Sequence, residues 1–500
     1  MRRHWTLRCL LVAVILSYPI VLGTPAAAGT TRAKPYDFNG DGYADLAIGV
    51  PGDRAGGKDG AGAVNVLYAS KGGLRSKDAQ LWSQASRGIK GKPSTYESFG
   101  DVVASGDFDC DGRADLAIGN STKLAALYGS RRGLTSRDQL VNAGLGRWEG
   151  SANGVEHLAA GDFDRDGCSE LAVAGGGHLA VHQGTSRGLR SPVRVSLPVG
   201  VADFGAYLGE GLVAGDLTGD GIDDLVTTGA SRTAAQGTFT GVAVIPGSAR
   251  GLQPSRAVRY GEEHPSIRQA SGRYFSYAFG ASMAIGDFNG DRHRDLAIGD
   301  SKAGQEEGVD DMLGDPLYCP GHLFCSGVVV VLRGTPAGLS ATNAQVWTKT
   351  TLGTPHQAGF GTVLAAGDVD GDGLDDLAVH EQWAVVVLRG SRTGLTTAGR
   401  QRWHLESPGV KGRTADDEFG SFGCGSIRLL DHGRGRGVDL SVGSQHHKDQ
   451  IGSVNVLYGS SRGLTASGDQ LWRQSTRGVP GVAASGDQFG GSSSCYVDAG

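Results

Sequence analysis

Apolar residues along this 500-residue chain fall into short runs and not into helical stripes. The runs at 46–49, 328–332 and 454–458 are typical, and most runs are bounded by glycine and aspartate. Short apolar runs between turn residues favour strands over helices, and no window shows a sustained helical period. The 84 glycines fit a chain of short strands joined by tight turns.

An acidic segment of nine residues precedes many of these runs. One copy reads Asp37-Phe-Asn-Gly-Asp-Gly-Tyr-Ala-Asp45, and another reads Asp368-Val-Asp-Gly-Asp-Gly-Leu-Asp-Asp376. We number the copies loop one to loop seven; they begin at Asp37, Asp107, Asp162, Asp216, Asp287, Asp368 and, in degenerate form, Asp431. A unit repeated in this way is typical of a solenoid or a propeller and not of a domain with a single core.

Three further features keep step with the acidic loops. A Phe-Gly pair precedes most loops, a second apolar strand follows each loop and ends in a Gly-Ser-x-x-Gly-Leu type of turn, and a Gln-x-Trp strand follows several turns. The Phe-Gly pairs lie at 99–100, 204–205, 279–280, 360–361 and 419–420, and the Gln-x-Trp strands at 80–82, 345–347 and 470–472. Each unit therefore predicts four short strands, and seven units predict an all-β, seven-bladed propeller.

Both ends of the repeat array favour a closed ring, which leaves no terminal sheet uncovered. The first repeat begins at its acidic loop without a Phe-Gly strand, while the segment 489–500 supplies a surplus one. We expect residues 489–500 to complete blade one. The predicted propeller spans 29–500, with repeats beginning near 37, 99, 154, 204, 279, 360 and 419.

The order of these motifs resembles the FG-GAP repeats of the integrin alpha-subunit propeller and of related secreted bacterial proteins. The resemblance rests on the Phe-Gly pair, the acidic loop with its following Leu-Ala-Ile-Gly, and the sequence Val50-Pro51-Gly52, where the family has Gly-Ala-Pro. The propeller region of glycosylphosphatidylinositol-specific phospholipase D is similar. The resemblance implies a propeller with cation loops on one face and partner binding on the other. It says less about function, because one scaffold supports many activities.

Loops one to six each offer oxygen side chains at positions 1, 3, 5 and 9 and a backbone carbonyl at position 7, around a turn residue at position 6. Calcium prefers six to eight oxygen ligands in flexible geometry. An EF-hand is excluded because position 12 falls in the next strand. The predicted ligands are Asp37, Asn39, Asp41, Tyr43 and Asp45; Asp107, Asp109, Asp111, Arg113 and Asp115; Asp162, Asp164, Asp166, Cys168 and Glu170; Asp216, Thr218, Asp220, Ile222 and Asp224; Asp287, Asn289, Asp291, His293 and Asp295; and Asp368, Asp370, Asp372, Leu374 and Asp376.

We expect the copies to differ in cation binding. Glu170 in loop three is a longer acid, Thr218 in loop four is a weaker ligand, and Arg292 replaces the turn glycine of loop five. Loop seven has Gly433 and Gly435 at its middle positions, so we predict no metal there. Two alternatives stand beside calcium. Magnesium is disfavoured by the lack of rigid octahedral geometry, and Asp-Gly turns can also simply cap hairpins.

The segment 1–28 predicts a secretory signal peptide, with a basic start, an apolar core and small residues at 26–28 that fit a cleavage site. A single membrane anchor is the alternative, and no later segment is long and apolar enough to span a bilayer. Six cysteines follow the signal, as suits an oxidising compartment. From fifteen possible connectivities we predict the sequential pairs Cys110–Cys168, Cys319–Cys325 and Cys424–Cys495.

No catalytic motif stands apart from the repeats. The segments 184–188 and 459–463 match a Gly-x-Ser-x-Gly elbow, but both fall on the turn that recurs in every unit. No His-Glu-x-x-His zinc motif occurs, and the pair His446-His447 has no recognisable third ligand. We therefore predict a protein that is not an enzyme and has no catalytic residue.

The leading hypothesis is a secreted, calcium-stabilised propeller that binds a protein or glycan outside the cell or at its surface. The largest insertion, between Asp300 and Gly327, is either a ligand-contacting loop or a neutral surface excursion. The net charge of −5 and the lack of a basic stripe argue against nucleic acid as a partner. The alternatives are a secreted hydrolase of phosphodiesters or polysaccharides, with its site at the propeller centre, and a structural envelope protein.

Overall fold

The computed structural model describes residues 32–491 with internal gaps, and the statements below concern the described residues. The gaps are 121–122, 142, 146–153, 199–210, 234–236, 262–263, 268–277, 302, 304–326, 354–358, 382, 413–418, 421–426 and 447–449. The predicted signal peptide 1–28 and residues 492–500 of the predicted closing strand lie outside the described residues.

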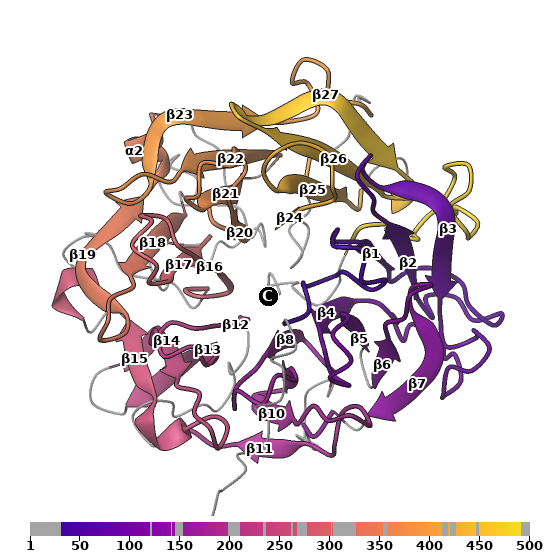
Figure 1. Cartoon of the computed structure of the whole chain (residues 1–500), viewed down its shortest axis with the longest axis horizontal. Helices are drawn as coiled ribbons and strands as arrows, with labels where there is room; N and C mark the ends of the chain where they lie inside the picture. Colours follow the sequence, from indigo (N-terminus) through magenta and orange to yellow (C-terminus); the bar gives the residue numbers. More distant parts are fainter. Residues whose placement is uncertain are drawn as a thin grey trace, which may run out of the picture. The chain divides into compact units, whose positions relative to one another are not determined.

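Seven antiparallel sheets are arranged in a ring, which confirms the predicted all-β, seven-bladed propeller (Figure 1). Six sheets have four strands in sequential order, and blade one has three among the described residues. The strands are β1 (Leu46–Val50), β2 (Ala63–Tyr68) and β3 (Arg75–Trp82) in blade one; β4 (Val102–Gly106), β5 (Asp115–Gly119), β6 (Leu124–Tyr128) and β7 (Thr135–Val141) in blade two; β8 (His157–Gly161), β9 (Glu170–Gly175), β10 (His178–His182) and β11 (Val193–Val195) in blade three; β12 (Leu212–Gly215), β13 (Asp224–Thr233), β14 (Gly237–Ile245) and β15 (Val258–Gly261) in blade four; β16 (Ser282–Gly286), β17 (Asp295–Asp300), β18 (Val328–Arg333) and β19 (Ser340–Trp347) in blade five; β20 (Leu364–Gly367), β21 (Asp376–Glu381), β22 (Ala384–Arg389) and β23 (Thr396–Trp403) in blade six; and β24 (Ile427–Leu430), β25 (Asp439–Ser444), β26 (Ser453–Ser460) and β27 (Gly463–Trp472) in blade seven.

Helical structure is confined to short turns in the described residues, including η1 (Pro254–Arg256) and α2 (Lys349–Leu352). None of the described helices has the length and apolar character that a membrane crossing requires.

In a complete blade the first strand lies nearest the ring centre and the fourth lies at the rim (Figure 1). The second and third strands are buried along almost their whole length, as in β17 and β18, because neighbouring blades cover both of their faces. These strands therefore read as continuous apolar runs. The fourth strands, such as β3, are partly exposed and carry mixed polar residues.

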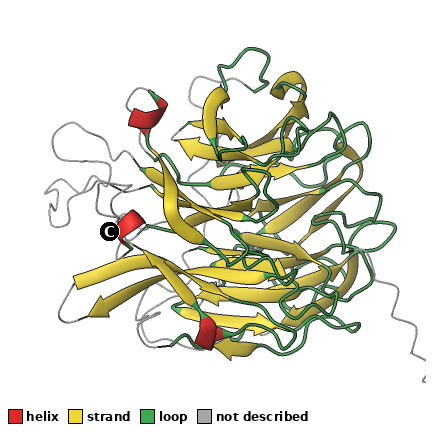
Figure 2. Ribbon diagram, turned by 60° about the vertical axis from the view of Figure 1, so that its left-hand side comes forward, coloured by secondary structure: helices red, strands yellow, loops and turns green. Residues whose placement is uncertain are grey.

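Each strand runs from one face of the ring toward the other (Figure 2). Each acidic loop joins the first strand of a blade to the second, and the Gly-Leu turns join the third strand to the fourth. Because the strands alternate in direction, both sets of connections lie on one face, which we call the loop face. The turns between the second and third strands and the connections between blades lie on the opposite face.

The hydrophobic core is divided into seven clusters, one at each interface between neighbouring blades. The cluster between blades one and two joins Val64 and Val66 to Leu116 and Leu127. Blades two to seven follow the same pattern. The seventh cluster packs β1 and β2 of blade one against β26 of blade seven, so the ring closes through its core.

Phe-Gly pairs fix the backbone next to the inner strands. Phe99 is 2% exposed, and its N–H donates to the Ala61 carbonyl at 2.9 Å. Gly100 has a φ of 95°, and an added Cβ would lie 2.5 Å from the Ala63 carbonyl oxygen. Glycine is therefore required, since other residues rarely adopt this conformation and have no room here. The recurrence of the Phe-Gly pair in this chain thus reflects a close approach of two backbones.

Glutamines of the Gln-x-Trp strands connect blades one, five, six and seven to the blade that follows each of them. Gln80 Nε2 of blade one donates to the Leu134 carbonyl of blade two at 3.0 Å. Gln470 Nε2 of blade seven donates to the Leu74 carbonyl of blade one at 2.9 Å. This second bond joins residues 396 positions apart in sequence, so it helps to close the ring.

The three described strands of blade one correspond to the second, third and fourth strands of the other blades. Gly490 N–H donates to the Gly49 carbonyl at 2.9 Å, just as Gly280 N–H donates to the Gly299 carbonyl at 2.8 Å in blade five. The first residues of the predicted closing segment 489–500 thus have the position that a first strand requires. Residues 492–500 lie outside the described part of the chain, so closure by this segment stays a prediction.

Candidate metal sites on the acidic loops

The first and ninth residues of each acidic loop organise the loop backbone. In loop one, the Asp37 carboxylate accepts hydrogen bonds from the N–H groups of Asp41 and Gly42, at 3.0 and 2.8 Å. The Asp45 carboxylate accepts one from Phe38 at 3.0 Å and one from the residue that follows the third strand at 2.8 Å. Equivalent bonds recur in loop two. They account for the constant spacing between the two acids, because both carboxylates must reach the same turn.

Two positions of a typical loop have a left-handed backbone, whereas the sequence pattern predicts only position 6. Gly42 at position 6 has a φ of 93°, and Gly40 at position 4 has a φ of 72°. In loop two, position 4 is Cys110, with a φ of 61°. Arg292 occupies position 6 of loop five with a φ of 71°, a conformation that costs about 1–2 kcal/mol for a residue other than glycine.

Three loops gather acidic side chains that could hold a metal ion. In loops two, three and six, one oxygen from each of positions 1, 3 and 9 lies within 4.8 Å of the other two. The clusters are Asp107, Asp109 and Asp115; Asp162, Asp164 and Glu170; and Asp368, Asp370 and Asp376. A set of oxygen donors suits a hard cation such as calcium or magnesium. The spacing in the sequence thus brings these predicted ligands together.

Loops one, four and five have a neutral side chain at position 3: Asn39, Thr218 and Asn289. In loops four and five, Thr218 Oγ1 and Asn289 Nδ2 are buried and have no hydrogen-bond partner among the described residues. Buried polar atoms are usually satisfied. Position 3 is therefore directed away from solvent in these two loops as well.

The acids at position 5 do not belong to the clusters found among the described residues. Asp111 accepts a hydrogen bond from the N–H of Arg113 at 3.0 Å, and Asp372 accepts one from Leu374 at 2.9 Å. The same bond forms at Asp41, Asp166, Asp220 and Asp291. Position 5 thus stabilises the turn, and its predicted role as a ligand, like that of the carbonyl at position 7, stays a prediction.

Burial raises the pKa of several loop carboxyls. At position 9 it raises the pKa of Asp45 and of Glu170 to about 8 and that of Asp376 to about 7. At position 1 it raises the pKa of Asp107 to about 6. Burial disfavours the charged form of a carboxyl, whereas a nearby cation favours it. These carboxyls therefore carry an electrostatic cost that a bound cation would relieve.

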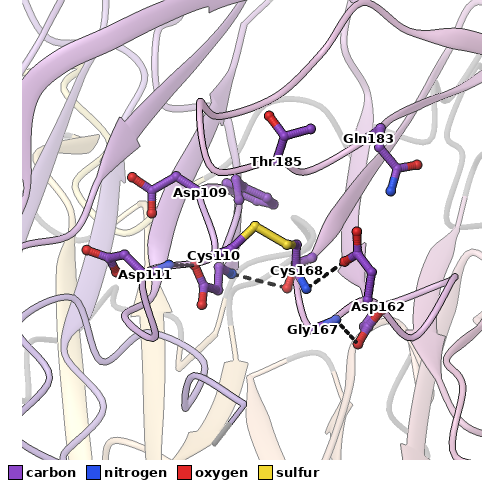
Figure 3. The surroundings of a disulfide bond; sticks show 12 residues. Asp109, Cys110, Asp111, Asp162, Gly167, Cys168, Gln183 and Thr185 are labelled. Atoms are coloured by element: carbon purple, nitrogen blue, oxygen red, sulfur yellow. Dashed lines mark hydrogen bonds between the residues drawn. A yellow bond between two sulfur atoms is a disulfide. The ribbon is translucent and has the colours of Figure 1, made fainter. Parts of the chain in front are cut away.

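A disulfide joins Cys110 of loop two to Cys168 of loop three, in agreement with the predicted pair (Figure 3). Asp109 and Asp111 flank it on one side and Asp162 lies on the other (Figure 3). The bond therefore ties together two neighbouring acidic clusters. The other two predicted pairs, Cys319–Cys325 and Cys424–Cys495, lie outside the described residues.

Backbone hydrogen bonds also link the loops of neighbouring blades. The N–H of residue 8 in one loop donates to the carbonyl of residue 1 in the loop before it, as in the bond from Ala114 to Asp37 at 3.2 Å. The bond from Ala44 to Asp431, at 2.8 Å, connects blade one to blade seven. Equivalent bonds run from Ser169 to Asp107, from Asp223 to Asp162, from Asp375 to Asp287 and from Val438 to Asp368. Backbone hydrogen bonds thus connect the loops of most neighbouring blades on the loop face.

A guanidinium group lies against the acids of loop six. Arg389, the last residue of β22, forms ion pairs with Asp370 at position 3 and Asp376 at position 9. Its Nη1 is 3.0 Å from Asp376 Oδ2. The three side chains are 12%, 12% and 3% exposed, so the pairs are largely shielded from water.

Other side chains face loops three and seven. Gln183, which follows β10, donates its amide hydrogens to Asp164 at 2.7 Å and to Glu170 at 2.8 Å. Lys34 Nζ is 2.8 Å from Asp431 Oδ2 of loop seven. Loop seven was predicted to bind no metal, and a lysine ammonium group lies at its first acid.

Comparisons with known proteins agree with this geometry. The FG-GAP repeat family matches residues 35–67 and 360–388, which contain loops one and six. The chain is 29% identical to Integrin alpha-PS2 of Drosophila melanogaster over 230 residues, which are 44% of this chain and 15% of that protein. The chain carries FG-GAP repeats.

The FG-GAP propeller is also similar to Phosphatidylinositol-glycan-specific phospholipase D of Bos taurus, at 27% identity over 374 residues, or 69% of this chain and 42% of that protein. The chain thus corresponds to less than half the length of either relative. An Agrocybe aegerita lectin that recognises non-reducing terminal N-acetylglucosamine has a TM-score of 0.50 at 13% identity, covering 90% of this chain and 93% of that one. That likeness shows the fold alone.

The FG-GAP loops contain an anchor residue that the sequence analysis did not single out. Position 2 is Phe38, Phe108, Phe163 or Phe288 in four loops, and each ring is 0% exposed. These rings belong to the clusters between blades. Each of these four loops is therefore attached to the core between its first and third residues. An apolar residue between two acids was the signal that could have revealed this anchor.

A cavity of about 240 Å³ lies at the centre of the FG-GAP propeller, between the inner strands. Its lining includes Glu156, His157, Ser282 and Arg428. Glu156 Oε1 accepts a hydrogen bond from the N–H of Gly176 at 3.3 Å. Burial lowers the pKa of His157 to about 4, so its imidazole is neutral near pH 7. A test of the alternative hydrolase hypothesis should therefore target these residues.

The other candidate residues lie on exposed turns or outside the described residues. Ser186 and Ser461, the serines of the two elbow-like segments, are exposed on turns between the third and fourth strands. Most of the predicted insertion, residues 304–326, and His447 of the histidine pair lie outside the described residues.

Proposed function

We propose that this FG-GAP propeller is a secreted protein that binds calcium on its loop face and a protein or glycan partner on its opposite face. The similarity to Integrin alpha-PS2 supports a binding module built on a propeller with cation loops. The predicted signal peptide 1–28 supports export, and sequencing of the mature N-terminus should then give Gly29 as the first residue.

The acidic clusters of loops two and three carry the calcium part of the proposal. Asp107, Asp109 and Asp115 present only oxygen donors, as calcium prefers. In loop three, Asp162 Oδ1 is buried and has no hydrogen-bond partner among the described residues, so it is available to a cation. Bound calcium would supply the positive charge that these buried carboxylates need. Magnesium fits less well because it demands near-ideal octahedral geometry.

Aromatic side chains on the opposite face support partner binding there. Tyr96, in the connection between β3 and β4, is 78% exposed. Trp383, in the turn between β21 and β22, is 49% exposed. The rings of these residues suit the apolar faces of sugars or a protein side chain. A rigid propeller also presents such connections without large loss of conformational entropy.

A glycan array and a cell-surface binding assay, each with calcium and with chelator, test the proposal. The Trp383→Ala and Tyr96→Ala variants should weaken binding at least several-fold. The Val193→Ala variant is the control, because Val193 is 70% exposed but lies on the outer strand β11. Equal binding by all three variants would place the partner elsewhere, and binding unaffected by chelator would separate it from the cation loops.

The hydrolase alternative rests on the similarity to Phosphatidylinositol-glycan-specific phospholipase D and on Glu156 and His157 in the central cavity. A phosphodiesterase assay on glycosylphosphatidylinositol substrates tests it. Activity that is lost in Glu156→Gln and His157→Gln would establish an enzyme. Absence of activity in the calcium-loaded protein would favour the binding module.

A further inference from the structure

The residue directly before the turn that joins the third strand to the fourth lies beside an acidic loop, and its side chain differs from blade to blade. In blade one it is Tyr68, whose hydroxyl turns away from the loop. That hydroxyl donates to Gln80 at 2.5 Å and accepts the N–H of Leu134 in blade two at 2.8 Å. Tyr458 of blade seven donates to Gln470 in the same way, at 2.6 Å. A tyrosine here serves the contact between blades and leaves the carboxylates of the loop to another partner.

Blades five and six both have arginine at this position, but the two guanidinium groups point to different partners. Arg333 Nη2 donates to the Thr393 carbonyl of the next blade at 3.0 Å. Arg389 instead turns to its own loop and pairs with Asp370 and Asp376.

The residue at position 3 also differs between the two loops. Loop five has the neutral Asn289 there, so a guanidinium at that loop would meet one fewer carboxylate. Loop six has Asp370, so that two carboxylates converge on one cation. A planar guanidinium with several donors suits such a pair of carboxylates, and charge-assisted hydrogen bonds of this kind are strong.

We propose that Arg389 is the resident cation of loop six, so that this loop is charge-compensated by the chain itself and does not bind calcium in the native protein. This inference rests on the proposed function, in which loops two and three bind calcium. Arg389 pairs with the carboxylates at positions 3 and 9, which are two of the three carboxylates of the cluster that calcium would need. Two cations a few ångströms apart also repel each other strongly where water is excluded. Calcium would therefore have to displace a shielded arginine that belongs to the chain itself.

Loop three shows the contrasting case. Gln183 occupies the corresponding place beside its loop, and its amide faces Asp164 and Glu170. The amide is neutral, and a rotation of its end would turn the carbonyl oxygen toward the loop as a further calcium ligand. Of these two side chains, only Arg389 brings a positive charge to the acids.

The number of calcium ions bound per chain at saturation, measured by equilibrium dialysis with elemental analysis, tests the inference. Arg389→Met keeps the aliphatic stem and removes the charge. We expect it to bind one calcium ion more than the wild type. Arg333→Met is the matched control, because that guanidinium faces Thr393 and not the acids of loop five; it should bind the same number as the wild type.

Asp370→Asn and Asp109→Asn keep the test decisive if Arg389→Met does not fold. In the otherwise wild-type protein, Asp109→Asn in loop two should lower the number of bound ions by one, and Asp370→Asn should leave it unchanged. A fall of one ion in Asp370→Asn would overturn the inference, because loop six would then already hold calcium. A wild type that binds no calcium would instead overturn the proposed function. In that case, the inference about loop six would still be supported if Arg389→Met bound one calcium ion and overturned if it bound none.

Discussion

Loops two and six have the same acids but different neighbours. Both have aspartate at positions 1, 3, 5 and 9, and both gather three carboxylates within 4.8 Å. The third strand of blade two ends in Tyr128, whose hydroxyl accepts the N–H of Leu189 in blade three at 3.3 Å. The third strand of blade six ends in Arg389, which pairs with two loop acids.

The comparison teaches that the acidic motif defines the oxygen atoms but not the cation that they hold. The side chain at the end of the third strand lies outside the nine-residue motif, so it varies without breaking the repeat. Loop two also carries the disulfide to loop three, whereas no disulfide joins loop six to its neighbours among the described residues. The two loops should therefore respond differently to loss of the disulfide, of an acid or of calcium.

Removal of the disulfide should produce the largest effect. The double variant Cys110→Ser/Cys168→Ser opens a link between residues separated by 58 positions, and such links contribute about 3–4 kcal/mol to the free energy of unfolding. Chemical denaturation monitored by intrinsic fluorescence measures the loss. Calcium binding should weaken at loops two and three and not elsewhere. A loss of stability below about 1 kcal/mol would show that backbone hydrogen bonds alone hold these loops together.

Acid should lower the stability of the fold through His432 of loop seven. This residue occupies position 2, as Phe38 does in loop one. His432 is 0% exposed, its Nδ1 lies 2.6 Å from the Ala44 carbonyl oxygen, and burial lowers its pKa to about 4. Because the folded state binds this proton less tightly than the unfolded chain, stability present above pH 6.5 is lost as the pH falls toward 4. The pKa difference corresponds to about 3 kcal/mol.

The His432→Phe variant isolates this contribution from the carboxyls that titrate in the same range. The stability difference between wild type and variant should fall by about 3 kcal/mol from pH 7 to pH 4, measured by urea denaturation at each pH. A difference that does not change with pH would mean that His432 is not responsible for acid sensitivity.

Neutralisation of position 3 should separate loops two and six by their response to calcium. A site with a dissociation constant of about 10⁻⁴ M, saturated at 10 mM calcium, stabilises the fold by about 2.7 kcal/mol. Asp109→Asn should remove about 2 kcal/mol of the calcium-dependent stabilisation. Asp370→Asn should leave that increment unchanged and lower stability equally with calcium and with chelator. Equal loss of the increment in both variants would contradict the distinction between the loops.

Relief of backbone strain in loop five should have the smallest effect. Arg292→Gly should raise the free energy of unfolding by about 1 kcal/mol, because Arg292 has a φ of 71°. Arg250→Gly is the control, since it lies in a turn outside the left-handed positions and should gain nothing. Thermal unfolding in chelator compares the two. A destabilised Arg292→Gly would show that the arginine side chain contributes more than its backbone costs.

Much of the fold could be predicted from the sequence because the strands of each repeat are indicated by signals within that repeat. Turn glycines, apolar runs and acidic spacings are local signals, and seven copies reinforce one another. The ring closure also had a local signal in the surplus Phe-Gly pair at Phe489, although the closing strand beyond it is outside the described residues. The disulfide between Cys110 and Cys168 was predictable because both cysteines occupy acidic loops of consecutive repeats.

The electrostatic environment of the loops could not be predicted in the same way. Arg389 and Arg333 have equivalent places in their repeats, but only the folded structure shows that they have different partners. Lys34 and Asp431 lie 397 positions apart, so nothing local in the sequence indicates their contact. The second left-handed position, at residue 4 of loops one to six, was missed because Cys110 and Arg165 occupy it as well as glycine.

Thermal unfolding of the mature protein in millimolar calcium, in equal magnesium and in chelator tests the central claim most directly. If the acidic loops are cation sites, calcium will raise the unfolding midpoint well above the value in chelator, and magnesium will raise it much less. Identical midpoints in all three conditions would contradict the account, because the acidic loops would then be hairpin turns whose buried carboxylates need no cation.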